Sequence, residues 1–322
     1  MAYSRSAMAT VEDFIAEWRS DCPYVIAHTS GSTGAPKEIR LLKDDMRASA
    51  RATNHRFGIT RDSVLACPLS VDYIAGKMMH VRTLEAGCRI IQLPISNHLE
   101  INESIDLLAI VPSQVESLLT IENASERIKN VIIGGAPLSD ELAARICQAG
   151  INAYATYGMT ETCSHVALAE ITGGESHFKA MPGITFRTDD RGCLVIDAPE
   201  FSFKTLTTND IVKLLTPTEF QWLGRFDNVI NSGGIKIFPE TLEKEIARWV
   251  NRPFYITSEK NSKWGEVPVI VFEGEQSEEK EIINLLRTKL DHRRCPGRAY
   301  AVTSLPRTSN GKLLRHHLLK NA

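Results

Sequence analysis

Apolar runs of strand length alternate with helix-like patterns along the first two-thirds of the chain. The helix-like stretches have apolar residues three and four positions apart, whereas the strand-like runs are nearly continuous in apolar residues. Such alternation predicts an α/β fold with a mainly parallel, helix-flanked sheet. Ligands of such sheets usually bind at the carboxyl ends of the strands. The strand-like runs are residues 24–28, 63–67, 88–93, 107–111, 131–135 and 152–158.

Polar residues mark where several helices of this part begin and end. Thr10 followed by Asp13 forms a capping-box pattern ahead of a helix. A second helix is expected near residues 73–85, and another should begin after Ser139 and stop at Gly150.

The pattern changes after about residue 226. A hairpin with a Ser-Gly-Gly turn at 232–234, a helix from Pro239, two strands, a helix near 278–290 and a last strand follow. This is the make-up of a small α+β domain. We therefore predict a large N-terminal domain over residues 1–226 and a small one over residues 227–322.

Composition and charge exclude several classes of protein. The 322 residues include 37 Lys and Arg against 39 Asp and Glu, so no bulk charge recruits nucleic acid or an anionic membrane. No segment has the roughly 18 consecutive apolar residues of a membrane span, and the N-terminus lacks a secretory signal. The seven cysteines form no C-x-x-C pair, which argues against a disulfide framework or a zinc site. We expect a soluble, cytoplasmic protein.

Residues 28–37, with the sequence HTSGSTGAPK, have the composition of a phosphate-binding loop. Glycines let backbone N–H groups close around an oxyanion, the hydroxyls add short donors and the lysine adds a positive charge. The loop is not a Walker A motif, because no Gly-Lys-Ser/Thr occurs at the required spacing. A flexible turn is the alternative, but the repeated Ser/Thr-Gly spacing before Pro-Lys favours a phosphate site.

This loop and four further blocks resemble the motifs of the adenylate-forming superfamily, which includes acyl-CoA synthetases, peptide-synthetase adenylation domains and luciferases. The resemblance implies a large domain, a small mobile domain and an enzyme that joins a carboxylic acid to AMP and then to a thiol. Five blocks in the family's order are far more specific than any one of them. They are TSGSTGAPK (29–37), YGMTE (157–161), LTTND (206–210), GRFDNVINSGGIKIFPETLE (224–243) and LPRTSNGKLLR (305–315).

The resemblance implies how ATP is bound. The loop would hold the β- and γ-phosphates, Thr160 would contact the α-phosphate, and Glu161 would hold Mg²⁺, which prefers carboxylate and phosphate oxygens. Asp210 would accept hydrogen bonds from the ribose hydroxyls, with Arg225 nearby, and Tyr157 would form one side of the adenine slot. The ATP-binding residues implied are Thr29, Ser30, Gly31, Ser32, Thr33, Gly34, Lys37, Gly134, Gly135, Ala136, Pro137, Tyr157, Asp210 and Arg225.

The resemblance also implies two successive reactions that use the small domain. Lys312 would bridge the acid's carboxylate and the α-phosphate during adenylation. The small domain would then rotate at Asp227, which removes this lysine and brings Gly233 and Gly234 beside the entrance for the thiol. The expected co-substrates and cofactors are therefore ATP, Mg²⁺ and coenzyme A.

The chain departs from the family's pattern at two points. Asn209 stands where the family has the glycine of T-G-D, and because asparagine tolerates a left-handed backbone, we expect the turn to be kept. The phosphate loop begins only 28 residues from the first residue, so we expect that much of the family's N-terminal subdomain is missing. Self-association into a homo-oligomer and a shallower pocket are the two expected alternatives.

Within the superfamily, four stretches resemble the o-succinylbenzoate–CoA ligase family. The acid of that family has two carboxylates, one on the succinyl arm that is activated and one on the ring. Its pocket therefore needs a cation or strong donors for the second charge. The stretches are residues 72–87, 111–119, 134–142 and 157–168.

We assign the second carboxylate to Lys77, which shares a helix face with Tyr73 and Val81 at i, i+4 and i+8. A lysine on the solvent face of the helix is the alternative. If Lys77 binds the acid, Lys77→Met raises KM for the dicarboxylate and spares ATP binding. Further candidates are His80, Arg82 and His165.

Two other functions stay open on the sequence. A stand-alone adenylating enzyme would load an aryl or amino acid onto a carrier protein and ignore coenzyme A. A non-catalytic nucleotide-binding protein would show no ATP–pyrophosphate exchange. The presence of Lys37, Glu161, Asp210, Arg225 and Lys312 argues against the non-catalytic alternative.

Overall fold

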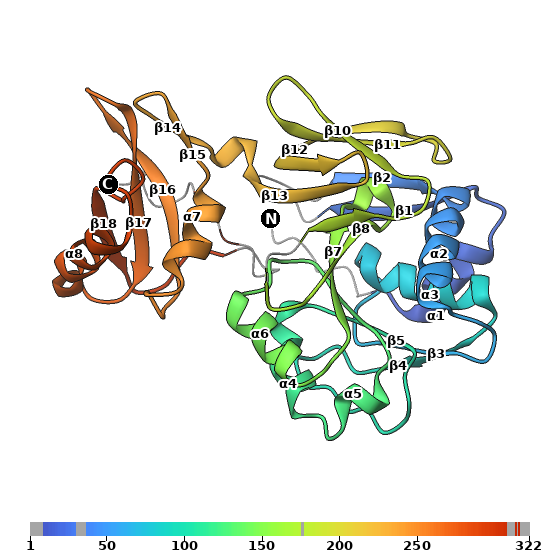
Figure 1. Cartoon of the computed structure of the whole chain (residues 1–322). Coiled ribbons are helices and arrows are strands. Elements are labelled where there is room, and N and C mark those ends of the chain that lie inside the picture. Colours follow the sequence, from blue (N-terminus) through green and yellow to red (C-terminus); the bar gives the residue numbers. More distant parts are fainter. Residues whose placement is uncertain (1–8, 30–36, 175–176, 308–312, 314, 316–322) are drawn as a thin grey trace, which may run out of the picture. The chain divides into compact units, whose positions relative to one another are not determined.

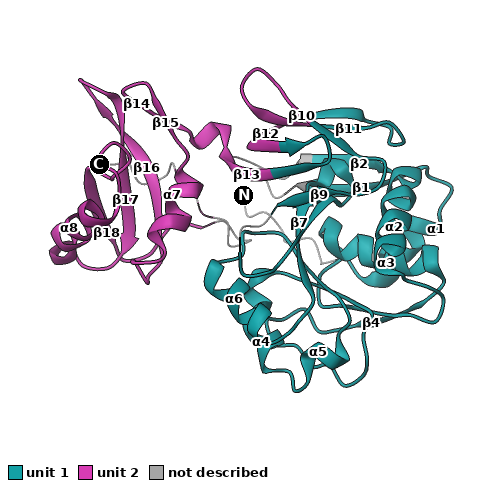
Figure 2. Cartoon of the chain, in the orientation of Figure 1, with its two compact units in different colours: residues 1–186, 196–206, 215–220 teal, residues 187–195, 207–214, 221–322 magenta. Residues whose placement is uncertain are grey.

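The computed structural model describes residues 9–29, 37–174, 177–307, 313 and 315 (Figure 1). It divides into two compact units (Figure 2). Unit 1 comprises residues 1–186, 196–206 and 215–220, and unit 2 comprises residues 187–195, 207–214 and 221–322. The assignment of residues 1–226 and 227–322 to two domains stays a prediction.

The helices and strands of unit 1 alternate as the apolar pattern predicts, and each predicted strand-like run lies on a strand. The helices are α1 (Val11–Arg19), α2 (Lys43–Phe57), α3 (Ile74–Ala86), α4 (Val115–Thr120), α5 (Ala124–Arg127) and α6 (Asp140–Gln148), with short 3₁₀ turns η1 (Pro112–Gln114) and η2 (Thr160–Thr162). The strands are β1 (Tyr24–Thr29), β2 (Lys37–Leu42), β3 (Val64–Cys67), β4 (Arg89–Gln92), β5 (Leu107–Ile110), β6 (Val131–Ile133), β7 (Ala153–Gly158), β8 (His165–Glu170) and β9 (Phe178–Ala180).

The predicted α/β class is confirmed, but the large sheet is mixed rather than mainly parallel. Strands β4, β3, β5, β6 and β7 are neighbours in this order and pair in parallel. The next two strands, β8 and β9, pair antiparallel. The reason is the short connection between β7 and β8, because a parallel pair needs a crossover of a dozen or more residues. Strands β10 (Thr185–Thr188), β11 (Cys193–Ala198), β12 (Lys204–Thr216) and β13 (Glu219–Arg225) follow, and the division between the two units runs through them.

Local signals and burial explain the helices of unit 1. Thr10 Oγ1 accepts the N–H of Asp13 at 3.1 Å, and the Asp13 carboxylate accepts the N–H of Thr10 at 3.0 Å, so the predicted capping box is confirmed. Ser139 likewise caps α6 through the N–H of Leu142. Helix α3 differs because residues 76–83 are buried without interruption. This burial covers the charged side chains on α3 as well as the apolar ones.

Unit 2 has its own sheet and core. Its elements are η3 (Phe226–Asn228), β14 (Ile230–Ser232), β15 (Ile235–Ile237), α7 (Pro239–Ile246), β16 (Phe254–Asn261), β17 (Gly265–Glu273), η4 (Gln276–Glu278), α8 (Glu279–Lys289) and β18 (Arg298–Val302). The sheet order is β15-β14-β17-β16, and β18 pairs with β17 in parallel. Apolar residues of α7 and α8, such as Leu242 and Leu286, pack on this sheet against Ile270 and Phe272. The predicted hairpin and the order of the following elements are confirmed.

All seven cysteines are free thiols. None of the helices in the described part of the chain is long and apolar enough to cross a membrane.

Candidate active site

The predicted phosphate loop connects the two strands of a small hairpin. Thr29 and Lys37 pair across the open end of β1 and β2, which form a separate antiparallel sheet. Ser30, Gly31, Ser32, Thr33 and Gly34 lie outside the described residues, so their assignment to the ATP phosphates stays a prediction.

The second block, YGMTE, forms a tight connection between β7 and β8. The buried Thr162 hydroxyl accepts the N–H of Met159 at 3.0 Å and lies 2.8 Å from the Ser164 carbonyl oxygen. A Cβ atom at Gly158 would overlap the Ser164 backbone, which explains the glycine. Cys163, the next residue after η2, has a φ of 62°, which is uncommon for a side-chain-bearing residue. The chain therefore turns sharply just where the predicted catalytic residues lie.

Thr160 and Glu161 occupy the 3₁₀ turn η2 within this connection. Thr160 is half-buried and Glu161 is exposed. Among the described residues no group of three or more His, Cys, Asp or Glu side chains forms a metal site. A single carboxylate still fits the predicted role, because Mg²⁺ is commonly bound by one or two carboxylates together with the phosphates of the substrate.

The predicted adenine slot begins where β6 and β7 run side by side. Gly134 follows β6, and a Cβ atom there would overlap the Thr156 hydroxyl on β7. Gly135, Ala136 and Pro137 continue from it and are exposed. Because Gly134 has no Cβ atom, the exposed segment that begins there can pass close to β7. An exposed segment of this kind is what a flat ligand bound beside β7 requires.

Tyr157, the predicted second wall of the slot, belongs to an aromatic cluster in unit 1. Its ring centroid is 5.0 Å from that of Phe220 in an edge-to-face arrangement and 5.6 Å from that of Phe178. These contacts fix the ring orientation at the end of β7.

In unit 2 the predicted ribose-binding carboxylate has partners on the following strand. Asp210 lies on β12 and is buried. The indole Nε1 of Trp222 on β13 donates to Asp210 Oδ1 at 3.2 Å, and Arg225 Nη1 is 3.7 Å from the same oxygen. The structure therefore brings Asp210 and Arg225 together as predicted. Trp222 was missed by the sequence reasoning, although it lies three residues before Arg225.

Asn209 does not form the expected turn. It lies within β12, and its φ is not positive, so no left-handed backbone is needed there. Instead, its side chain accepts a hydrogen bond from Arg191 at 3.2 Å and donates to Asp227 at 3.4 Å. Asparagine is tolerated because the strand is extended, and its amide has polar partners on both sides.

The predicted hinge residue and glycine loop also lie in unit 2. Arg225 Nη2 donates to Asp227 at 3.0 Å, so one arginine contacts both Asp210 and the hinge. The N–H of Gly233 donates to the Trp264 carbonyl at 2.9 Å, and the Trp264 side chain packs against this turn while remaining about half exposed. Gly234 follows in the same turn.

Lys312 lies outside the described residues. The residues that flank it are anchored, since Arg307 and Leu313 form an antiparallel bridge, and Leu313 packs against Tyr255 and Leu305.

Lys77, the predicted ligand of the second carboxylate, is buried in unit 1. Its side chain is 8% exposed, so the solvent-face alternative does not hold. Its ammonium is 3.5 Å from the Glu17 carboxylate and 4.6 Å from the centroid of the Phe14 ring. Tyr73, at the N-cap of α3, is about half exposed. Lys77 therefore already has an anionic partner within the protein.

Arg82, on the same helix, is a buried cation of a different kind. It is 2% exposed and makes no ion pair with any described carboxylate. Nη2 donates to the Ser164 hydroxyl at 2.6 Å, Nη1 lies 3.3 Å from Met79 Sδ, and Nε has no hydrogen-bond partner in the described part of the chain. Burial lowers the pKa of Arg82 to about 10, so it stays protonated at neutral pH. Burial also raises the pKa of the nearby Cys67 thiol to about 11, so this group does not neutralise Arg82.

His165, another candidate, continues the polar chain from Arg82. Its Nδ1 is 3.4 Å from Ser164 Oγ, and its Nε2 is 3.2 Å from Thr53 Oγ1, which donates to the Ser49 carbonyl. Burial, followed by the charge of Arg82, lowers the pKa of His165 well below its ordinary value. A neutral imidazole with its proton on Nε2 satisfies these bonds. His80 is also buried and contacts Gln92 rather than this chain.

Comparison with known proteins identifies the class to which this fold and these blocks belong. The chain belongs to the AMP-binding enzyme family, which it matches over residues 4–197. The predicted resemblance to the adenylate-forming superfamily and the prediction of an AMP-forming acid–CoA ligase are confirmed.

Particular relatives agree with this class. The chain is 25% identical over 332 residues to the 2-succinylbenzoate–CoA ligase of Enterococcus faecalis, covering 91% of this chain and 68% of the relative. It is 31% identical to an acyl-CoA synthetase (AMP-forming)/AMP-acid ligase II-like protein from Dyadobacter fermentans, with a TM-score of 0.63 and coverage of 96% and 92%. The o-succinylbenzoate CoA synthetase of Bacillus subtilis, solved with ATP and magnesium, has the same fold at 20% identity, with a TM-score of 0.76 and coverage of 91% and 69%.

Proposed function

We propose that this enzyme activates a carboxylic acid that carries a second carboxylate, namely 2-succinylbenzoate, and transfers its acyl group to coenzyme A. The reaction would consume ATP and release AMP and pyrophosphate. Family membership supports the adenylating chemistry, and the name of the Enterococcus faecalis relative suggests the acid. The cytoplasmic location and any self-association remain predictions.

The isolated charge of Arg82 carries the proposal for the acid. A buried cation without an anion is costly, because no nearby charge repays the loss of its hydration. The edge formed by Nε and Nη2 can bind a carboxylate through two parallel hydrogen bonds. Among the residues that the structure describes, Nε on this edge has no partner and Nη2 contacts only the Ser164 hydroxyl. The ring carboxylate of the acid would supply the missing charge, and this role moves from Lys77 to Arg82.

The residues present fit ATP and Mg²⁺. Gly134 leaves an accessible segment beside β7, and Asp210 is a buried carboxylate already oriented by Trp222. Mg²⁺ bound with ATP would neutralise phosphate charge next to Glu161. Asp210 would accept hydrogen bonds from the two ribose hydroxyls, and the Thr160 hydroxyl would donate to an α-phosphate oxygen.

The first reaction would be positioning and charge neutralisation more than covalent catalysis. An oxygen of the succinyl carboxylate forms a bond to the α-phosphorus, and the bond from this phosphorus to pyrophosphate breaks. Both reactants are anionic, so a cation between them lowers the barrier. The Lys312 ammonium would supply that cation.

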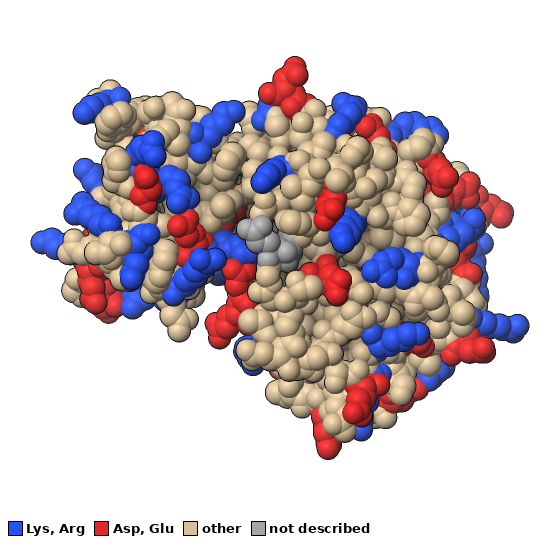
Figure 3. Space-filling model, in the orientation of Figure 1, with Lys and Arg blue, Asp and Glu red and all other residues tan. Residues whose placement is uncertain are grey.

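The thiol acceptor would be anionic too. Residues 221–322 contain 17 Lys and Arg against 12 Asp and Glu, although the whole chain has a net charge of −2. Lys and Arg side chains are spread over the visible face of unit 2 (Figure 3). Such a surface attracts the phosphates of coenzyme A, and an acidic carrier protein would be attracted equally. A coenzyme A dependence assay separates the two acceptors.

ATP–pyrophosphate exchange with 2-succinylbenzoate tests the proposal directly. We expect exchange that depends on the acid, and thioester formation when coenzyme A is added without any carrier protein. Lys312→Ala should lower exchange by on the order of 100-fold or more, because it removes a charge made for the transition state. Exchange without preference among acids, or none at all, would contradict the proposal.

A further inference from the structure

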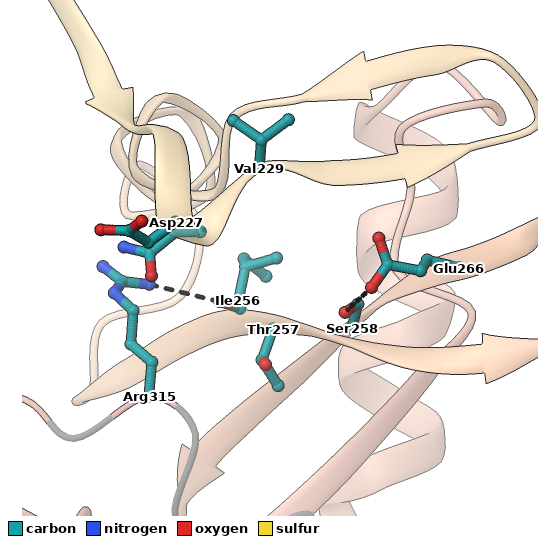
Figure 4. A pocket seen from close by; sticks show the side chains of 8 residues that line it. Asp227, Val229, Ile256, Thr257, Ser258, Glu266 and Arg315 are labelled. Carbon is teal, nitrogen blue, oxygen red and sulfur yellow. Dashed lines mark hydrogen bonds between the residues drawn. The ribbon is translucent and has the colours of Figure 1, made fainter. Parts of the chain in front are cut away.

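The last residue of the block LPRTSNGKLLR is a partly buried arginine in unit 2. Arg315 follows Lys312 by three residues, and its side chain is 16% exposed. Its guanidinium binds both carboxylate oxygens of Glu243 on α7, with 2.7 Å between Nη2 and Oε2. Nη1 also donates to the Ile256 carbonyl on β16 at 3.2 Å (Figure 4). The chain just beyond the lysine is therefore fixed to both a helix and a strand.

Helix α7 also contacts Asn228, the residue that follows the predicted hinge residue. Glu240 lies one turn before Glu243 on α7 and accepts a hydrogen bond from Asn228, which follows Asp227 directly. Arg315 Nε is 3.9 Å from the Glu240 carboxylate. Asp227, Asn228 and Arg315 border one polar cavity of about 140 Å³ (Figure 4). Two carboxylates on α7 thus connect the hinge segment to the end of the lysine block.

We infer that Arg315 is a positioning residue for Lys312, because its pair with Glu243 fixes the chain beyond the lysine to the helix that also holds the hinge segment. This inference rests on the proposed function, since it assumes that Lys312 acts in adenylation. A long lysine side chain has many rotamers, so its placement depends on how well its backbone is fixed. Misplacement by about 1 Å can cost on the order of 100-fold in rate.

A purely structural salt bridge would affect both half-reactions alike, whereas a positioning role affects adenylation alone. Lys312 is proposed to act only when the acyl-adenylate forms. Thioester formation from an adenylate that is already made should therefore not need the Arg315–Glu243 pair. The two half-reactions can be measured separately, as ATP–pyrophosphate exchange with 2-succinylbenzoate and as coenzyme A acylation by synthetic 2-succinylbenzoyl-adenylate.

The informative variant is Arg315→Met combined with Glu243→Leu, which removes both charges of the pair, while Glu240 keeps its hydrogen bond from Asn228. The matched control is Arg294→Met, because Arg294 pairs at 3.1 Å with Glu245 on the same helix but contacts neither the lysine block nor the hinge. We expect the double variant to lower pyrophosphate exchange by on the order of 10- to 100-fold. Acylation from the synthetic adenylate should stay within about twofold of wild type, and the control should keep both activities.

Wild-type exchange in the double variant would overturn the inference, and so would an equal loss in both half-reactions. The midpoint of thermal unfolding, measured for each protein, shows whether the double variant is folded at the assay temperature. If neither wild type nor Arg294→Met exchanges pyrophosphate with any acid, the proposed function fails, and this inference fails with it. If only the double variant loses exchange, the proposed function holds and the loss is due to the missing Arg315–Glu243 pair.

Discussion

Arg82 of unit 1 is buried and Arg315 of unit 2 is partly buried, but only Arg315 has a carboxylate partner among the described residues. Arg315 has a two-point carboxylate partner in Glu243, whereas Arg82 has only a hydroxyl and a thioether among the described residues. Burial lowers the pKa of Arg82 to about 10. Burial also acts to lower the pKa of Arg315, but the hydrogen bonds and charge of Glu243 outweigh it and raise this pKa.

The difference suggests how a buried charge can be interpreted. A charge with an internal partner fixes two segments of the chain to each other, here the C-terminal block to α7. A charge without one destabilises the protein until an anion binds. We therefore assign Arg315 to positioning the chain next to Lys312 and Arg82 to substrate binding.

The largest expected effect is on the stability of Arg315→Met. This substitution leaves the partly buried Glu243 carboxylate without its cation, which costs up to about 3–5 kcal/mol in the free energy of unfolding when such a group is fully buried. The double variant with Glu243→Leu should recover most of the loss. Urea unfolding at pH 7 measures both. A loss below about 1 kcal/mol in the single variant would show that the pair is not buried as described.

Arg82→Met should have the opposite outcome for stability. Methionine fills similar space without a charge, so the free energy of unfolding should stay the same or rise by up to about 2 kcal/mol. The same urea experiment checks this. A large loss in the free energy of unfolding would indicate that Arg82 has an internal anionic partner, and Arg82 and Arg315 would then not differ in this respect.

A smaller effect should appear in the pH dependence of stability. The pKa of His165 is lowered in the folded state by burial and by Arg82, so the unfolded chain binds a proton more readily. Stability is then complete above the unfolded pKa of about 6.5 and falls by up to about 1.4 kcal/mol per pH unit below it. His165→Gln should reduce this slope between pH 6.5 and 5.5. Burial also lowers the pKa of His80, so the contribution of His80 to the slope should remain. An unchanged slope would show that His165 binds a proton as readily in the folded protein as in the unfolded chain.

The smallest effect is expected for Lys77→Met. Because Lys77 is paired with Glu17, KM for 2-succinylbenzoate should change by less than about twofold if Arg82 binds the ring carboxylate. The sequence-based assignment predicts a clear rise instead. Steady-state kinetics with ATP held saturating distinguishes them, and a rise equal to that of Arg82→Met would return the role to Lys77.

Local features of the fold could be predicted from the sequence because their causes lie close together in the chain. The Thr10 capping box, the Ser139 cap and the hairpin at 232–234 depend on neighbouring residues, and all three are present. The antiparallel half of the large sheet was not expected, since apolar runs do not specify strand direction.

Whether a buried charged side chain has a partner of opposite charge could not be predicted from local patterns. Arg82 meets Ser164 across 82 positions of sequence, and Arg315 meets Glu243 across 72. The sequence motifs identified which residues to examine, including Asp210 and Arg225, but no local pattern indicates that Lys77 has a carboxylate partner and Arg82 does not. Trp222 beside Asp210 was missed for the same reason, since only strand pairing brings them together.

The most direct test of the account compares 2-succinylbenzoate with 4-oxo-4-phenylbutyrate, which lacks the ring carboxylate. ATP–pyrophosphate exchange gives kcat/KM for each acid in wild type and in Arg82→Met. We predict that wild type prefers the dicarboxylate by about 30-fold or more, as expected for a buried charge pair worth at least about 2 kcal/mol, and that Arg82→Met loses this preference. An Arg82→Met enzyme that kept the wild-type preference would contradict the account.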